Sequence, residues 1–316
     1  MRRRRLLAAV IFVFVALGAF VSGAAVVVAS RVEHRAVRRV RPPVVTYTRA
    51  AAYSQSVSCP APSLDGALPA MVYLPSGYRG GNARYPVIYF LHGLPATRSA
   101  YQTNGFVAAS VPGGRQGAIV VAPQGARTDG ADREYLDWDA KEDWPQALTT
   151  ELTHCIDLRY RTYARRSGRA LVGLSAGGYG AFNVGLRALK TFGVLESWSG
   201  YFVATDPSGN HVLDLGSPEA NDAARAPDDA ALASALKYYP SLLAFYIGNQ
   251  DSRFLAMNRQ YDAALTASGI SHVFRVYPGG HSIALWQTEA AGWLRMALQA
   301  LAAERARSSP TSVGAP

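Results

Sequence analysis

The stretch from 169 to 180, Arg-Ala-Leu-Val-Gly-Leu-Ser-Ala-Gly-Gly-Tyr-Gly, constrains the fold of this chain more than any other. Its first half is a short apolar run typical of a strand buried on both faces, and a helix-compatible run follows. Gly173 and Gly177 flank Ser175 in a Gly-x-Ser-x-Gly pattern. A serine on so tight a strand-to-helix turn brings the flanking chain segments close together, and glycine provides the necessary space. We therefore predict that Ser175 is an exposed nucleophile.

The five-residue pattern alone also occurs by chance in glycine-rich chains, so its surroundings decide its meaning. Predicted strands alternate with predicted helices, and this alternation requires parallel pairing with helices on both faces of the sheet. The sequence therefore predicts an α/β domain with a mostly parallel sheet. We expect strands over 67–74, 85–91, 117–123, 170–174, 194–198, 242–247 and 272–277, and helices over 144–160, 181–189, 230–237, 258–268 and 283–303.

The net charge of +10 is concentrated at the amino end of the 316-residue chain. Residues 1–50 contain ten arginines and one glutamate, whereas the rest contains 22 Lys and Arg against 21 Asp and Glu. Nucleic acid binding requires a basic face on the folded domain, and this nearly neutral domain gives no sign of one. Nucleic acid is therefore not an expected partner.

The amino-terminal segment combines the four arginines Arg2–Arg5 with an uncharged run over 6–30. A helix of that length, at about 1.5 Å per residue, spans the roughly 30 Å hydrocarbon core of a membrane. Because a signal peptide usually has an apolar core of only about 7 to 15 residues, we favour a transmembrane anchor over 1–30. Signal cleavage near Ser22 and Ala24, or a twin-arginine signal, stays open. Either alternative predicts export. The domain would then be anchored to the cell membrane on its outer side, or secreted after signal cleavage.

The rest of the chain divides into a linker, a folded domain and a tail. Residues 31–58 are basic and contain few large apolar side chains, so we expect a stalk. The domain is expected over 59–305, before a disordered tail over 306–316. Within it, 199–230 is long, polar and irregular, and this stretch is a candidate lid or acyl-group pocket. The sequence does not predict the oligomeric state.

The two cysteines, Cys59 and Cys155, can form one disulfide in an exported chain. Such a bridge would close a loop of about 96 residues and contribute on the order of 4 to 5 kcal/mol in the chain-entropy model. The alternative is two unpaired thiols. Neither spacing resembles a zinc site or a catalytic cysteine pattern, and no metal or cofactor is predicted.

A second backbone feature lies over 92–95, at the end of a predicted strand. When a serine attacks a carbonyl group the oxygen becomes negative, and two amide groups fixed in advance stabilise it. We assign these amides to Ala176, directly after the serine, and to Leu94, where Gly93 lets the backbone turn inward. His92 is interpreted as structural, because it precedes the serine and lies beside this turn.

A reactive serine needs a histidine that accepts its proton and an acid that orients the histidine. His281 follows a strand end after the serine, where two glycines let a loop carry the ring back over the sheet. Asp251 follows a buried strand and a glycine turn, and it is the expected acid. An Asp in this place also serves as a helix N-cap, and Asp206 is the alternative acid.

The loop over 124–143 is rich in glycine and aspartate, and we expect it to lie over the serine. Its aromatic residues include Tyr135 and Trp138. Two interpretations stay open for them: they line a substrate groove, or they pack in the core or at its rim.

Four motifs together resemble the esterase D group of α/β hydrolases, over about residues 60–303. They are Gly-Leu-Ser-Ala-Gly-Gly-Tyr-Gly, the strand ending Leu-His-Gly, Gly-Asn-Gln-Asp and Gly-Gly-His-Ser-Ile-Ala-Leu-Trp. This group includes S-formylglutathione hydrolases, feruloyl-esterase-like domains and the secreted antigen 85 mycolyltransferases. The resemblance implies an α/β-hydrolase fold. It also implies that Ser175, Asp251 and His281 form a catalytic triad. The backbone amides of Leu94 and Ala176 would then form the oxyanion hole.

The resemblance to mycolyltransferases extends to single segments. Residues 281–286 are similar to their histidine segment and 135–138 to their aromatic loop, which implies Trp286 as a further substrate-lining candidate. Mycolyltransferases have an acidic residue where His92 stands and a Glu where this chain has Asp251. These differences favour an ordinary exported esterase.

The sequence thus predicts an exported serine carboxylesterase that hydrolyses a small-molecule or lipid ester through an acyl-serine intermediate. Two alternatives stay open. One is acyl transfer to a cell-envelope sugar or another alcohol, and the other is a catalytically inactive binding domain.

Overall fold

The computed structural model describes residues 53–95, 97–129, 133–206 and 208–308. The predicted anchor over 1–30 lies outside these residues, as do most of the predicted linker and most of the tail. No helix within the described part of the chain has the length and apolarity that crossing a membrane requires. The anchor and the signal peptide therefore stay predictions.

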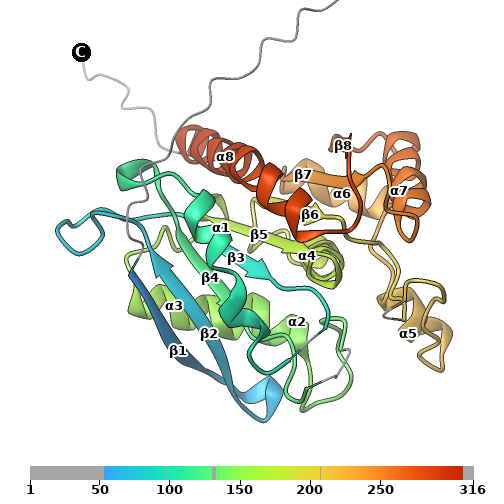
Figure 1. The fold of residues 1–316 in the computed structure, drawn as a ribbon, viewed down its shortest axis with the longest axis horizontal. Coiled ribbons are helices and arrows are strands. Elements are labelled where there is room, and N and C mark those ends of the chain that lie inside the picture. Colours follow the sequence, from blue (N-terminus) through green and yellow to red (C-terminus); the bar gives the residue numbers. More distant parts are fainter. Residues whose placement is uncertain (1–52, 96, 130–132, 207, 309–316) are drawn as a thin grey trace, which may run out of the picture. The chain divides into compact units, whose positions relative to one another are not determined.

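An eight-stranded sheet forms the centre of the domain, in the order β1-β2-β4-β3-β5-β6-β7-β8 (Figure 1). β1 pairs with β2 and β2 with β4 in antiparallel fashion, and all other neighbours are parallel. The predicted mostly parallel sheet is confirmed. The strands are β1 Tyr53–Ala61, β2 Gly66–Leu74, β3 Val87–Leu91, β4 Ile119–Pro123, β5 Arg169–Leu174, β6 Val194–Trp198, β7 Leu242–Gly248 and β8 Val273–Tyr277.

Helices cover both faces of this sheet (Figure 1). They are α1 Gly105–Ser110, α2 Trp144–Gln146, α3 Thr153–Arg159, α4 Ala176–Arg187, α5 Pro218–Ala223, α6 Ala230–Tyr238, α7 Leu255–Ala267 and α8 Ile283–Ser308. Successive side chains of a strand point to opposite faces. On β3, Ile88 and Phe90 belong to the apolar cluster that includes α1 and α8, whereas Val87, Tyr89 and Leu91 belong to the cluster that includes α3, α4 and α7.

The sheet begins earlier than the sequence predicted. β1 starts at Tyr53 and pairs with β2 along its whole length, so the end of the segment predicted as a linker, 31–58, belongs to the domain. The serines of β1 are exposed, whereas Cys59 and Ala61 are buried. An edge strand with one solvated face is poor in apolar residues, and its sequence therefore resembles a linker. At the other end, α8 continues past the predicted boundary at residue 305.

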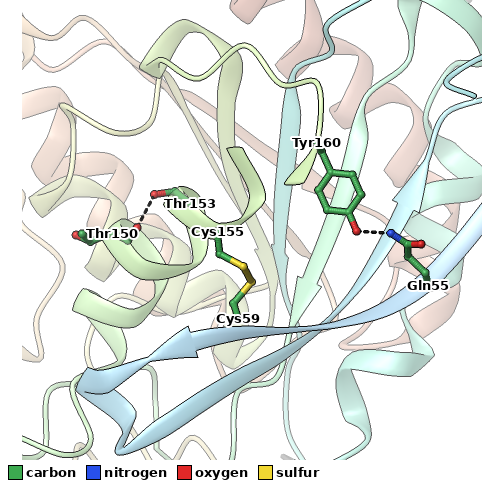
Figure 2. Close-up of a disulfide and its surroundings, with 6 residues drawn as sticks. All are labelled: Gln55, Cys59, Thr150, Thr153, Cys155 and Tyr160. Atoms are coloured by element: carbon green, nitrogen blue, oxygen red, sulfur yellow. Dashed lines mark hydrogen bonds between the residues drawn. A yellow bond between two sulfur atoms is a disulfide. The ribbon is translucent and has the colours of Figure 1, made fainter. Parts of the chain in front are cut away.

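A disulfide joins Cys59 on β1 to Cys155 on α3 (Figure 2). The helix predicted over 144–160 consists of consecutive segments, because a π-helical stretch, Ala147–Leu152, lies between α2 and α3. Near the bridge, Gln55 Nε2 donates a hydrogen bond to Tyr160 Oη. The edge strand is therefore held to the end of this helical segment by a covalent bond and by a side-chain hydrogen bond.

Candidate active site

Ser175 lies on a sharp turn between β5 and α4. Its φ of 54° and ψ of −123° are rare for a residue with a side chain, and such strain is typical of functional sites. A Cβ atom at Gly173 would collide with the carbonyl oxygen of Gly177, and one at Gly177 would collide with that of Leu91. Both positions of the predicted elbow therefore require glycine, and the turn presents Ser175 beyond the carboxyl end of β5.

The structure brings Ser175, His281 and Asp251 together in one hydrogen-bonded chain. His281 Nε2 lies 2.8 Å from Ser175 Oγ, and His281 Nδ1 lies 2.6 Å from Asp251 Oδ2. The geometry fits an imidazole that donates its Nδ1 hydrogen to the carboxylate and accepts the serine hydroxyl hydrogen at Nε2. Asp251 is only 2% exposed, so its carboxylate holds the imidazole in a site that is largely shielded from water.

The loops after β7 and β8 hold the acid and the histidine side by side. The N–H of Gln250 donates to the carbonyl of Gly279 at 2.8 Å, and the N–H of Gly279 donates to Asn249 Oδ1 at 3.1 Å. A Cβ at Gly248 would collide with the Gly279 backbone. Gly279 itself has a φ of 133°, which a residue with a side chain rarely adopts. These contacts explain why glycines precede both Asp251 and His281.

Asp251 also binds the start of α7. Its Oδ1 accepts a hydrogen bond from the N–H of Phe254 at 3.4 Å, and its carbonyl accepts one from the N–H of Leu255 at 3.1 Å. The carboxylate therefore uses one oxygen for the helix terminus and the other for His281. The N-cap of α7 is Phe254, so Asp251 is not the predicted N-cap, although it accepts hydrogen bonds from the turn that leads into this helix.

His92 organises the loop that carries Leu94. Its Nδ1–H donates to the carbonyl of Gly93 at 2.9 Å, and its Nε2 accepts from the N–H of Gly125 at 2.9 Å. Burial lowers the pKa of His92, so the ring is neutral, as these two hydrogen bonds require. Tyr135 Oη donates to the His92 carbonyl oxygen at 2.7 Å. These contacts correspond to the structural role expected of His92.

The predicted oxyanion-hole residues lie on either side of the elbow. Leu94 and Ala176 both line a narrow cavity beside it, and Leu94 also lines the larger cavity that contains Ser175. A Cβ at Gly93 would approach Ser175 Cβ to 2.9 Å, so glycine at this position lets the two backbones come close. The two backbone amides therefore belong to segments that meet at the serine.

Tyr135 and Trp138 do not belong to the described lining of the cavity at Ser175. Tyr135 is 3% exposed, and its hydroxyl is used by the His92 carbonyl. Trp138 is half-buried and donates from Nε1 to the carbonyl of Arg133 at 2.9 Å. Of the two interpretations of these aromatic residues, packing therefore fits the structure, because their polar groups donate to the backbone carbonyls of His92 and Arg133.

A cavity of about 300 Å³ opens beside Ser175 and His281. Its walls include the aromatic rings of Tyr201, Phe254 and Trp286. The Trp286 ring meets the His281 ring edge-on, with centroids 5.1 Å apart, and Tyr201 stacks on Phe254 at 4.7 Å. Trp286, which the family resemblance implied as a substrate-lining candidate, thus lines the cavity that contains Ser175. Tyr201 comes from the long stretch predicted as a lid or pocket.

Two charged residues, Arg253 and Asp206, also line this cavity. Asp206, the alternative acid, does not pair with His281. Its Oδ2 accepts from His211 Nδ1 at 3.0 Å and its Oδ1 accepts from Ser208 Oγ at 2.8 Å. The hydrogen bonds from His211 and Ser208 hold the pKa of the Asp206 carboxyl well below its usual range, so it is an anion.

Sequence reasoning did not find Glu134, Tyr201, Arg253 or Phe254. Glu134 is 3% exposed and accepts hydrogen bonds from Tyr201 Oη at 2.5 and 2.7 Å. Nothing in the loop sequence distinguishes Glu134 from its acidic neighbours. Tyr201 and Phe254 could have been proposed, because each lies a few residues beyond a strand end at the same edge of the sheet.

Residues 61–295 match the protein family described as "Putative esterase". Esterase Rv1288 of Mycobacterium tuberculosis strain H37Rv is 26% identical over 235 residues, which are 66% of this chain and 51% of the relative. The chain therefore spans about half the length of that curated relative.

Two solved structures share the fold. An S-formylglutathione hydrolase from Agrobacterium tumefaciens has a TM-score of 0.64 at 20% identity, covering 80% of this chain and 96% of its own. MPT51 of Mycobacterium tuberculosis has a TM-score of 0.60 at 19% identity, covering 78% of this chain and all of its own, 100%. At these identities the likeness shows the α/β-hydrolase fold.

Proposed function

The chain belongs to the "Putative esterase" family, in the esterase D and antigen 85-like group of α/β hydrolases, and from this premise we propose that it is a serine carboxylesterase. The observation that carries the proposal is the hydrogen-bonded chain Ser175 Oγ, His281 Nε2, His281 Nδ1 and Asp251 Oδ2. In a family of esterases, this arrangement supports nucleophilic attack on an ester carbonyl.

The first half of the reaction forms an acyl-serine. Ser175 Oγ bonds to the ester carbonyl carbon while His281 Nε2 accepts the hydroxyl proton, and Asp251 stabilises the imidazolium. The carbonyl oxygen becomes negative, and the N–H groups of Leu94 and Ala176 donate to it. The carbon–oxygen bond to the alcohol then breaks, and His281 returns its proton to the departing alkoxide. The alcohol leaves, and the acyl group stays on Ser175.

The second half releases the acid by the same steps in reverse. His281 Nε2 accepts a proton from a water molecule, and the hydroxide attacks the acyl carbon. The bond between that carbon and Ser175 Oγ breaks, and the proton on His281 returns to the serine. The free acid leaves, and the hydrogen-bonded chain is restored without any net change to the protein.

We propose that this reaction takes place outside the cytoplasm. The uncharged run over 6–30 after four arginines supports export, and disulfides such as Cys59–Cys155 persist mainly in oxidising compartments. Fractionation of cells followed by immunoblotting tests this part. Recovery of the full-length chain from the cytoplasm with both thiols reduced would contradict it.

The mechanism is tested with 4-nitrophenyl acyl esters and the Ser175→Ala variant. We expect kcat/KM to fall by at least about 10³-fold, with a thermal midpoint close to that of the wild type, since only a hydroxyl is lost. Ser252→Ala is the matched control, because Ser252 is an exposed serine near the same sheet edge. Equal activity of Ser175→Ala and the wild type would refute the mechanism.

The same assay separates hydrolysis from acyl transfer. Products from an ester series of increasing acyl length are analysed with and without trehalose as an alcohol acceptor. Hydrolysis predicts the free acid as the main product in both cases. An acylated sugar in excess of the free acid would favour the transferase alternative instead.

A further inference from the structure

A guanidinium group lies at the rim of the Ser175 cavity, and none of the acidic residues that the structure describes forms an ion pair with it. Arg253 lines the cavity, is exposed, and makes no ion pair or side-chain hydrogen bond with any residue that the structure describes. A guanidinium presents donors in a planar fork that matches a carboxylate or a phosphate. A cation in this position is available to an incoming ligand.

The position of Arg253 is tied to the catalytic chain. It lies in the short turn between Asp251 and α7, and its guanidinium carbon lies 5.2 Å from the centroid of the Phe254 ring. Phe254 is 2% exposed, stacks on Tyr201, and has its ring centroid 5.6 Å from that of His281. The same buried ring is therefore a near neighbour of both the guanidinium and the proposed catalytic imidazole.

Asp206, the anion on the same cavity wall, is occupied within its own turn. Its Oδ2 accepts from His211, and its Oδ1 accepts from Ser208 Oγ and from the N–H of Asn210. These bonds satisfy both carboxylate oxygens locally, whereas the Arg253 donors remain unused by the described residues. The cavity therefore offers a set of free cationic donors beside apolar and aromatic walls.

We propose that Arg253 selects esters that carry an anionic group, a carboxylate or a phosphate, beside an apolar or aromatic body. This inference rests on the proposed hydrolysis at Ser175 and names the substrate class of that site. The apolar part of the substrate contacts Phe254 and Trp286, and the anionic group binds the guanidinium fork. The anionic group can stand on the acyl side or on the alcohol side of the ester, and the experiment distinguishes the two.

The test compares esters in matched pairs, each consisting of an anionic ester and a neutral analogue of similar size. On the acyl side, mono-4-nitrophenyl adipate is compared with its neutral methyl ester. On the alcohol side, 3-acetoxybenzoate is compared with neutral 3-acetoxybenzamide. We expect the charged member of one pair to have about a threefold to tenfold higher kcat/KM, mainly through a lower KM. This preference should largely vanish near 1 M NaCl, where the Debye length is about 3 Å.

Substitutions at Arg253 assign the preference to this side chain. Arg253→Gln should bring the ratio of kcat/KM for charged and neutral esters close to one, and Arg253→Lys should keep part of it. Arg253→Glu should invert the ratio. Arg259→Gln is the matched control, because it removes the same charge from an exposed site on α7 outside the cavity lining. The control should keep the wild-type ratio.

The failures of the two proposals are distinguishable. If the wild type hydrolyses the neutral esters through Ser175 but prefers neither charged ester, the inference falls and the esterase function stands. A charge preference that survives Arg253→Gln overturns the inference in the same way. If the wild type hydrolyses no member of either pair, the esterase function falls and the inference falls with it.

Discussion

Tyr201 donates its hydroxyl hydrogen to the buried carboxylate of Glu134, with Oη–Oε distances of 2.5 and 2.7 Å. Glu134 lines the narrow cavity beside the elbow together with Leu94 and Ala176, and Tyr201 lines the cavity at Ser175. The hydrogen bond therefore connects the Glu134 loop, which borders the cavity at the proposed oxyanion hole, to the wall of the proposed substrate cavity.

Tyr201→Phe should lower the free energy of unfolding by about 1 to 3 kcal/mol, because a buried carboxylate loses a donor while the stacked ring remains. Urea unfolding measures the change. A double-mutant cycle with Glu134→Gln tests the pair itself, with an expected coupling of about 0.5 to 3 kcal/mol. Because glutamine keeps an oxygen that can accept this hydrogen bond, strictly additive effects of the two substitutions would show that the carboxylate contributes no more to the contact than an amide does.

Asp251→Asn should lower kcat by on the order of 10³ to 10⁴-fold while the domain stays folded. Asparagine keeps an oxygen for the Phe254 N–H but loses the charge that orients the His281 tautomer and stabilises its protonated form. Steady-state kinetics and a thermal melt measure both properties. Asp206→Asn should lower kcat less than about tenfold, because Asp206 binds His211 and not His281. The reverse ranking would make Asp206 the catalytic acid.

Removal of the disulfide should lower stability with little effect on catalysis. The bridge joins β1 to α3, and β2, β4 and β3 lie between β1 and the nucleophile strand β5. The double variant Cys59→Ala with Cys155→Ala should lose about 2 to 5 kcal/mol of unfolding free energy, with kcat/KM within about twofold of the wild type. Reduction of the wild type with dithiothreitol should reproduce the loss in urea unfolding. An unchanged unfolding midpoint after complete reduction would contradict this expectation.

His92 should make the domain less stable in mild acid. Burial lowers the pKa of His92 in the folded state, so below the unfolded value of about 6.5 the unfolded chain binds a proton that the folded chain does not. Stability is therefore fully present above about pH 6.5 and falls as the pH falls from there toward the folded pKa, by at most about 1.4 kcal/mol per pH unit.

The contribution of His92 is isolated by substitution. Urea unfolding is compared at about pH 7.5 and about pH 5.5 for the wild type and His92→Gln, and the variant should show the smaller loss between the two. His154→Gln is the control, because His154 is exposed on α3. Identical pH dependence in the wild type and both variants would show that His92 does not contribute.

The residues that could be predicted from sequence are those at tight turns, because the backbone conformation there requires glycines that are visible in the sequence. The elbow at Ser175 needs glycines on both sides, and Asp251 and His281 follow glycine turns after buried strands. Parallel strands bring their carboxyl ends to one edge, so these residues could be placed at one site without coordinates. The same reasoning gave the sheet, since strands buried on both faces are continuous apolar runs.

Other residues could not be predicted, because their roles depend on packing between distant segments. Glu134 is notable only because Tyr201 lies against it, and Arg253 only because its turn borders the cavity. Tyr135 is an aromatic residue of the kind that lines substrate grooves. Its ring is nevertheless buried, because Gly125 and Gly180 have no side chains and leave room for it. Such pairings carry no short-range periodicity.

Covalent labelling tests the central claim, a Ser175 hydroxyl made reactive by His281, most directly. A fluorophosphonate reagent phosphonylates activated serines, and intact-protein and peptide mass spectrometry count and locate the adduct. We expect one adduct per chain, on Ser175, formed at least about 10²-fold more slowly in His281→Ala and absent from Ser175→Ala. An adduct on another serine, or labelling of Ser175 at an unchanged rate without His281, would contradict the mechanism.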